Sequence, residues 1–233
     1  MSYCIKWAGA SRSFPERHAF LDNASAEGDC QVYLGACAGK EYVDNRANLC
    51  ADAIVAIELK DECLGVYTDE AEALLDTQRG SKRVFGFARF RLGKAAPTQL
   101  IELVVPREHD EAALQVLKAL FENAGFVVAI CNDFPGRIVN RLIRPYYNAV
   151  LRRYDEKLAT AEDLDTTLKM GLGYPEGPLA LLDRTGLAEH AETSQALYEA
   201  LGDPSFVPAR LAANARLAAR AGKPAPLCVA RQN

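Results

Sequence analysis

The chain has 233 residues, a length that fits one large domain or two small ones. Hydrophobic residues make up 49% and charged residues 25%, the balance of a folded protein with a core, which excludes disorder as the main state. The formal net charge of −4 disfavours a nucleic-acid partner, and without a long apolar run or a signal peptide we expect a cytoplasmic protein with no membrane partner.

Short apolar runs that are typical of strands dominate the chain up to residue 131. Several are continuous rather than alternating, as expected for strands that are covered on both faces. Glu111–Ala124 carries a one-sided apolar stripe and lies between two such runs, which indicates a β-α-β unit and a mostly parallel sheet. The expected strands are Tyr3–Trp7, Gln31–Leu34, Ile54–Ile57, Leu64–Tyr67, Val84–Phe90, Leu100–Val105 and Phe126–Ile130.

Helical patterns replace the strands after residue 131. We expect Pro145 to kink or split the first of these helices, and Thr160 followed by Asp163 to cap the next one. The expected helices are Ile138–Leu158, one that begins after Thr160, Leu179–Leu201 and an Ala/Arg-rich helix from Pro208 to Gly222. The sequence therefore predicts two domains, residues 1–131 and residues 132–233.

The chain has seven cysteines. Their odd number and the absence of a CxxC pair indicate neither a disulfide framework nor a zinc site, so we expect no metal. They are Cys4, Cys30, Cys37, Cys50, Cys63, Cys131 and Cys228.

Three linked motifs occur in the second part of the chain. They read DFPGRIVNRLIRPYYNAV (Asp133–Val150), TAEDLDTTLKMGLGYPEGPLALLDRTGL (Thr160–Leu187) and LGDPSFVPARL (Leu201–Leu211). In order and spacing they resemble the C-terminal helical domain of the 3-hydroxyacyl-CoA dehydrogenase family, whose pattern reads PGFxxNRLLxPxxNEA, AEDIDxAMKxGxGYPMGPFELxDxxGLD and LGDPxFxP. Upstream, Lys82–Val104 more weakly resembles the family segment RFxGxHFFNP followed by KLVEVI.

This resemblance implies an α/β plus all-α protein. Residues 1–131 would form a truncated, degenerate Rossmann-like parallel sheet domain of the NAD-binding type, and residues 132–233 a helical dimerisation and substrate domain. NAD would lie on the sheet and an acyl-CoA in the interdomain cleft, with a homodimer formed through the helical domain. The family reaction is the NAD-linked oxidation of 3-hydroxyacyl-CoA to 3-ketoacyl-CoA.

In this family a His–Glu pair supplies the base, since a histidine beside a carboxylate titrates near neutral pH. The family glutamate matches Glu102, and the asparagine of the NRL motif matches Asn140. The histidine position falls on Ala88, and the histidines of this chain, His18, His109 and His190, lie elsewhere. The family's catalytic serine falls in Gly65–Asp69, where Thr68 offers the nearest hydroxyl.

The dinucleotide motif GxGxxG, which lets backbone amides reach a pyrophosphate, is also missing. After Tyr3–Trp7 there is a single glycine, Gly9, and the GxxxGK of Leu34–Lys40 is one spacing short of a phosphate-binding loop. The stretch before the PGF motif is shorter than the family's, which suggests that part of the first mononucleotide-binding half is lost or rebuilt.

A group of arginines gives a weaker indication. Arg137, Arg141 and Arg144 share a helix face by spacing and could meet CoA phosphates, while a solvated or dimer-lining face is the simpler interpretation.

Three hypotheses follow. The chain is a working 3-hydroxyacyl-CoA dehydrogenase with Glu102 and Asn140 as site residues, or a catalytically silent homologue that binds an acyl-CoA or another small ligand, or an enzyme with altered chemistry.

Overall fold

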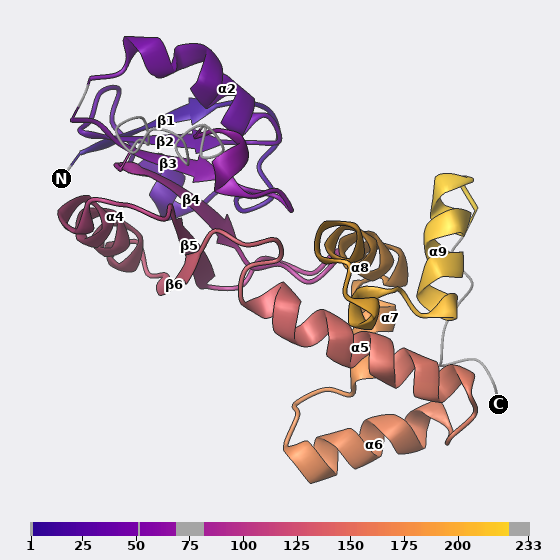
Figure 1. The fold of residues 1–233 in the computed structure, drawn as a ribbon. Coiled ribbons are helices and arrows are strands. Elements are labelled where there is room, and N and C mark those ends of the chain that lie inside the picture. Colours follow the sequence, from indigo (N-terminus) through magenta and orange to yellow (C-terminus); the bar gives the residue numbers. More distant parts are fainter. Residues whose placement is uncertain (1, 51, 69–81, 224–233) are drawn as a thin grey trace. The chain divides into compact units, whose positions relative to one another are not determined.

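A computed structural model describes residues 2–50, 52–68 and 82–223 of the chain (Figure 1). These residues pack into two units. The first lies within Met1–Phe90 and Pro97–Ile138, and the second within Arg91–Ala96 and Val139–Asn233. The short segment Arg91–Ala96 therefore belongs to the second unit although it lies between two strands of the first.

The first unit is built on a six-stranded sheet whose strands lie side by side in chain order. The strands β1 to β4 are parallel, β4 and β5 are antiparallel, and β5 and β6 are again parallel. Their bounds are β1 Tyr3–Trp7, β2 Cys30–Leu34, β3 Ile54–Glu58, β4 Val84–Arg89, β5 Leu100–Val105 and β6 Val127–Asn132. The predicted fold class, a mostly parallel sheet followed by a helical part, is confirmed.

Both faces of the sheet are covered, as the continuous apolar runs predict. Successive side chains of a strand point to opposite faces, so Val32 packs in one buried cluster and Tyr33 in the other. Helix α4 (Glu111–Asn123) and the short α1 (Ala19–Asp22) contribute to the first cluster, and α2 (Ala38–Asn45) covers the other face (Figure 1).

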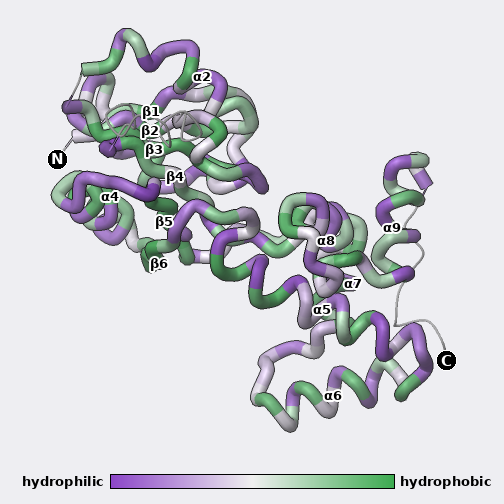
Figure 2. The backbone as a smooth tube through the Cα atoms, viewed as in Figure 1, coloured by the Kyte–Doolittle hydropathy of each residue, from purple (hydrophilic) through white to green (hydrophobic). Residues whose placement is uncertain are grey.

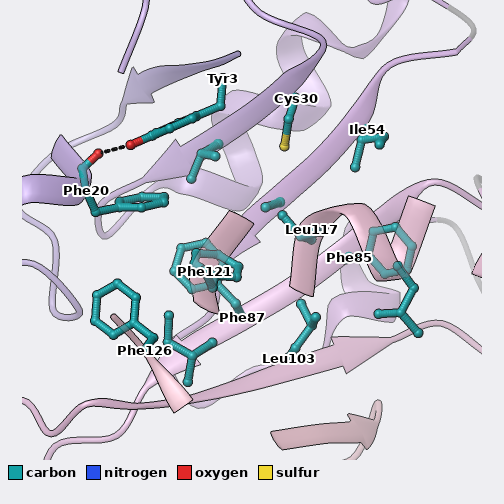
Figure 3. Packing of buried hydrophobic residues seen from close by; sticks show 14 of the residues in the cluster. Tyr3, Phe20, Cys30, Ile54, Phe85, Phe87, Leu103, Leu117, Phe121 and Phe126 are labelled. Carbon is teal, nitrogen blue, oxygen red and sulfur yellow. Dashed lines mark hydrogen bonds between the residues drawn. The ribbon is translucent and has the colours of Figure 1, made fainter. Parts of the chain in front are cut away.

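Aromatic rings fill much of the cluster on the α4 side (Figure 3). The Tyr3 and Phe20 rings stack with centroids 4.9 Å apart, and the Tyr3 hydroxyl donates to the Phe20 carbonyl. Phe87 of β4 and Phe121 of α4 also meet, with centroids 5.0 Å apart. These contacts attach helix α1 and helix α4 to the same face of the sheet.

The second unit is helical. Its helices are α5 Val139–Asp155, α6 Ala161–Leu172, α7 Pro178–Thr185, α8 Leu187–Leu201 and α9 Arg210–Arg220. The predicted cap at Thr160 is confirmed, because its hydroxyl oxygen accepts the Asp163 N–H at 3.1 Å. Gly173 and Gly202 end α6 and α8 in the left-handed conformation that favours glycine.

Three details of the prediction are wrong. Leu64–Tyr67 is not a strand, because Leu64–Val66 forms a 3-10 turn whose first N–H groups, those of Leu64 and Gly65, donate to the Asp133 carboxylate at 2.8 and 2.7 Å. Leu179–Leu201 is two helices, since the chain turns at Gly186 with φ +110°. Of the two effects predicted for Pro145, a kink or a split, the split is wrong, because α5 continues through it from Val139 to Asp155.

Candidate active site and the edge of the sheet

Glu102 lies in the middle of strand β5 and is 1% exposed. In the antiparallel register of β4 and β5, the residue directly opposite Glu102 is Ala88. Directly opposed residues point to the same face of a sheet. Glu102 therefore faces the position at which the family pattern has its histidine. In this chain the side chain at that position is the methyl group of Ala88.

The carboxylate of Glu102 is bound by the turn that leads into the helical unit. Ile138 N–H donates to Oε1 at 2.8 Å, and Arg137 Nε donates to Oε2 at 3.3 Å. The same guanidinium donates from Nη2 to the carbonyl oxygen of Lys60 at 2.6 Å. Gly136 and Arg137 both have positive φ, +80° and +50°, so this turn holds two successive residues in the region that favours glycine.

Sequence reasoning missed Arg137 as the partner of Glu102. It placed Arg137 on one helix face with Arg141 and Arg144, and this grouping is wrong. Helix α5 begins only at Val139, so Arg137 precedes it, while Arg144 is buried inside the helical unit and Arg141 is exposed. The overlooked signal is that Arg137 stands where the family pattern has the phenylalanine of PGF, in a chain that also lacks the histidine.

Asn140, the second predicted site residue, lies in the first turn of α5 in the helical unit and is 6% exposed. Its side-chain oxygen accepts from Arg144 Nε at 2.9 Å. Arg144 Nη1 lies 3.0 Å from His190 Nδ1, and His190 Nε2 lies 2.9 Å from Asn148 Oδ1. A guanidinium can only donate, so Nδ1 accepts and the Nε2–H donates to Asn148.

This network makes His190 a neutral, structural histidine. Burial, and secondarily the charge of Arg144, lower the pKa of His190 well below its usual value. The other two histidines also have local roles. His18 caps α1 and stacks on Phe126 with centroids 4.8 Å apart, and His109 Nδ1 lies 3.2 Å from the Pro106 carbonyl oxygen.

The place expected for the catalytic serine is only partly described, since Asp69 of Gly65–Asp69 lies outside the described residues. Thr68 is buried and follows the 3-10 turn, not a strand. The parallel partner of β4 is β3, which ends in Glu58.

Glu58 occupies the carboxyl edge of the parallel strands, where a dinucleotide fold binds its cofactor. Its Oε1 accepts from Ser13 N–H at 2.6 Å and from Ser11 Oγ at 3.0 Å, and its Oε2 accepts from Gly35 N–H at 2.8 Å. NAD, which the resemblance implies, would need amides of these loops for its pyrophosphate. Two of them already hold a buried carboxylate, so the residues present do not fit that group.

Within residues 2–50, 52–68 and 82–223, no helix is long and apolar enough to cross a membrane. In the same ranges, no three His, Cys, Asp or Glu side chains are grouped so that they could hold a metal ion.

Known proteins match this chain in both units. The family model described as 3-hydroxyacyl-CoA dehydrogenase, C-terminal domain, matches residues 136–229. A 3-hydroxybutyryl-CoA dehydrogenase of Bradyrhizobium diazoefficiens is 28% identical over 186 residues, which cover 78% of this chain and 61% of that protein. The mitochondrial hydroxyacyl-coenzyme A dehydrogenase of Sus scrofa is 40% identical over 89 residues, which cover 38% of this chain and 28% of that protein. The chain thus spans less than two thirds of these relatives.

Solved structures show the same fold. The (S)-3-hydroxybutyryl-CoA dehydrogenase of Ralstonia eutropha has a TM-score of 0.68 at 22% identity, with 84% of this chain and 69% of that chain covered. The 3-hydroxybutyryl-CoA dehydrogenase of Escherichia coli has a TM-score of 0.69 at 22% identity, with 89% and 42% covered.

Proposed function

Because this chain belongs to the 3-hydroxyacyl-CoA dehydrogenase family, we propose that it binds an acyl-CoA-type small molecule without carrying out the family's NAD-linked oxidation. The observation that carries this proposal is the pairing of Glu102 with Arg137 opposite Ala88. The ligand class is taken from the relatives, which are named as dehydrogenases of 3-hydroxybutyryl-CoA and hydroxyacyl-coenzyme A.

Oxidation of a secondary alcohol requires a group that accepts the hydroxyl proton. A guanidinium keeps its protons in proteins and cannot accept one. Glu102 could accept a proton, but both of its oxygens already receive hydrogen bonds from the turn at Arg137 and Ile138. Loss of a positioned base lowers a rate by about 10²–10⁴-fold, so any residual oxidation is expected to be very slow.

The test uses the full chain with acetoacetyl-CoA, by titration calorimetry and by loss of NADH absorbance. We expect saturable binding of acetoacetyl-CoA and no NADH oxidation above the blank.

The second candidate, a working dehydrogenase, is favoured by the buried Glu102 and Asn140 at family positions. NADH oxidation that Glu102→Gln abolishes and Glu122→Gln preserves would establish that candidate instead. Glu122 is a suitable control because it lies on α4 and pairs with Lys118 at the surface. Absence of acetoacetyl-CoA binding would overturn the proposed ligand class.

We further propose that the chain forms a homodimer through its helical unit. Hydrophobic and hydrophilic residues alternate along α6 (Figure 2), whose one buried residue is Ala161. Met170 is 78% exposed and Leu172 is 59% exposed, and a second copy of this helical unit would cover them.

Light scattering on a sizing column is expected to give a dimer mass for the wild type and a monomer mass for Met170→Glu. The neighbouring Lys169→Glu, also at an exposed position, serves as the control and should leave the mass unchanged. A monomer mass for the wild type at micromolar concentration would contradict the dimer.

A further inference from the structure

Glu58, the last residue of strand β3, is a carboxylate that is 5% exposed. It receives hydrogen bonds from two loops that follow different strands. Ser11 and Ser13 belong to the loop after β1, and Gly35 directly follows β2. A buried carboxylate is stable only where donors surround it, so Glu58 is the centre on which these two loops converge.

The loops themselves leave little room to move. Gly35 has φ +116°, and a Cβ atom there would collide with the backbone of Ala8 and Gly9. Arg89 fixes the other side of the first loop, since its N–H donates to Ser13 Oγ at 3.2 Å and its Nη1 to the Ser13 carbonyl at 3.3 Å. The positions of both amides are therefore set by packing and by Arg89 as well as by Glu58.

Backbone N–H groups at the carboxyl ends of parallel strands are the usual binding groups for a phosphate or pyrophosphate. Here the Ser13 and Gly35 amides bind the chain's own anion. A second anion at the same amides would be repelled by the buried charge, and burial strengthens that repulsion because little water screens it.

The strand order gives an independent indication. Dinucleotides bind where the order of strands in an open sheet reverses and opens a crevice. In the part of the chain that the structure describes, the order runs from β1 to β6 without a reversal. The described strands therefore do not form a crevice of that kind.

We propose that Glu58 is a built-in substitute for the cofactor's pyrophosphate, and that it keeps dinucleotides and free pyrophosphate off this edge. The proposal concerns residues of the first unit alone. It is independent of the proposed acyl-CoA binding and gives a second reason, besides Arg137, for the lack of NAD-linked turnover that we propose.

The chain contains one tryptophan, Trp7, which ends β1 beside these loops and is 54% exposed. Bound NADH would quench its fluorescence by energy transfer, so Trp7 reports on this edge directly. We expect no saturable quenching of the wild type by NADH and no calorimetric binding of inorganic pyrophosphate. In Glu58→Ser, which removes the charge and frees the amides, we expect pyrophosphate affinity to rise by about ten-fold or more.

Glu62→Ser is the matched control. The Glu62 carboxylate also accepts backbone N–H groups just after β3, from Lys60 at 3.2 Å and Asp61 at 3.0 Å, but it does not contact the loops after β1 and β2. We expect this variant to behave like the wild type.

Saturable NADH binding to the wild type, or a folded Glu58→Ser protein that gains no pyrophosphate binding, would overturn the proposal. If circular dichroism shows that Glu58→Ser does not fold, Glu58→Ala decides: it also removes the charge and frees the amides, and its gain or lack of pyrophosphate binding supports or overturns the proposal. Acetoacetyl-CoA binding by the wild type tests the proposed function separately, so the two failures are distinguishable.

Discussion

Arg137 stands in a left-handed backbone conformation while its guanidinium reaches a buried carboxylate, and both features carry a free-energy cost. The costs are offset because the guanidinium satisfies Glu102 and the Lys60 carbonyl at once. Compared with the family pattern, this chain has Ala88 in place of a histidine and Arg137 in place of a phenylalanine. The Glu102 carboxylate thus has the Arg137 guanidinium as its partner instead of an imidazole. An imidazole can exchange protons near neutral pH, and a guanidinium cannot.

The pairing predicts a strong coupling between these two residues. Arg137→Met leaves Glu102 charged and buried, so we expect the free energy of unfolding to fall by about 3–5 kcal/mol. Glu102→Gln combined with Arg137→Met should cost less than the sum of the single changes, measured by urea unfolding as a double-mutant cycle. Arg141→Met, at an exposed position of α5, should change stability by less than about 0.5 kcal/mol. Additive single changes would contradict the pairing.

His190 predicts a pH dependence of stability. Its pKa in the folded protein lies well below the ordinary value of 6.5, first because of burial and then because of Arg144. The unfolded chain therefore binds a proton that the folded chain does not. The stabilisation is complete above about pH 6.5 and is lost as pH falls from there toward the lower folded-state pKa, by at most about 1.4 kcal/mol per pH unit.

His190→Gln removes this titrating group. We expect the variant to be less stable at pH 7.5, because it loses contacts to Arg144 and Asn148. Its free energy of unfolding should depend less on pH than that of the wild type between about pH 6.5 and 5. Urea unfolding across this range is the measurement, and equal slopes for the two proteins would show that His190 does not contribute.

At the scale of elements, a single carboxylate connects two helices. Asp165 of α6 accepts the Leu179 and Ala180 N–H groups at the start of α7, each at 2.9 Å. These are N–H groups that a helix cannot satisfy internally. Gly177 is required beside it, because a Cβ atom there would collide with the Asp165 side chain.

Asp165→Ala is expected to lower the free energy of unfolding by about 1–2 kcal/mol, since it removes a cap from α7. Asp165→Asn keeps one acceptor oxygen and should lose less. The control is Glu162→Gln, which changes an exposed acid in the first turn of α6, the helix that also carries Asp165. Urea unfolding followed by circular dichroism checks all three, and equal stability of Asp165→Ala and the wild type would show that α7 needs no cap.

The sequence predicts these elements best where periodicity and caps agree. Thr160 with Asp163 marks the start of α6, and the stripe of Glu111–Ala124 becomes α4 nearly residue for residue. The break at Gly186 is missed because apolar residues continue on both sides of it. Leu64–Tyr67 is misread because a short apolar run does not distinguish a strand from a turn that is held by a distant carboxylate, here Asp133.

At the candidate site, too, local patterns predict the regular elements and miss contacts between residues that are distant in sequence. The motif assigns Glu102 and Ala88 to two regular strands, and the register of these strands sets the two residues directly opposite each other. Arg137 and Glu58 are missed because their partners are distant in sequence, 35 residues for Glu102 and between 23 and 47 for the donors to Glu58. An acid residue that ends an apolar run, as Glu58 does, is the available signal.

At the scale of the whole molecule, the segment Arg91–Ala96 joins the helical unit from inside the sequence of the sheet unit. Lys94 N–H donates to the Thr185 carbonyl at 2.7 Å, and Lys94 Nζ pairs with Glu189 at 3.3 Å. Gly93 has φ +53° and packs against the Thr185 carbonyl so closely that a Cβ atom would collide with it. The segment is thus part of the helical unit's own packing.

Gly93→Ala is therefore expected to destabilise the helical unit by more than about 1 kcal/mol. Hydrogen exchange should accelerate in α7 and α8 and stay unchanged in β3. Lys94→Ala, which removes only a surface ion pair, should cost less than about 1 kcal/mol. Unchanged exchange in α7 of Gly93→Ala would show that the segment does not stabilise this unit.

The same segment has a consequence for how such a protein can change over generations. A recombination event that joins residues 139–233 to a different sheet domain would leave Arg91–Ala96 behind, and with it the hydrogen bond to Thr185. Only exchanges that bring an equivalent six-residue excursion would yield a complete helical unit. Residues 139–233 alone therefore do not make up the whole helical unit.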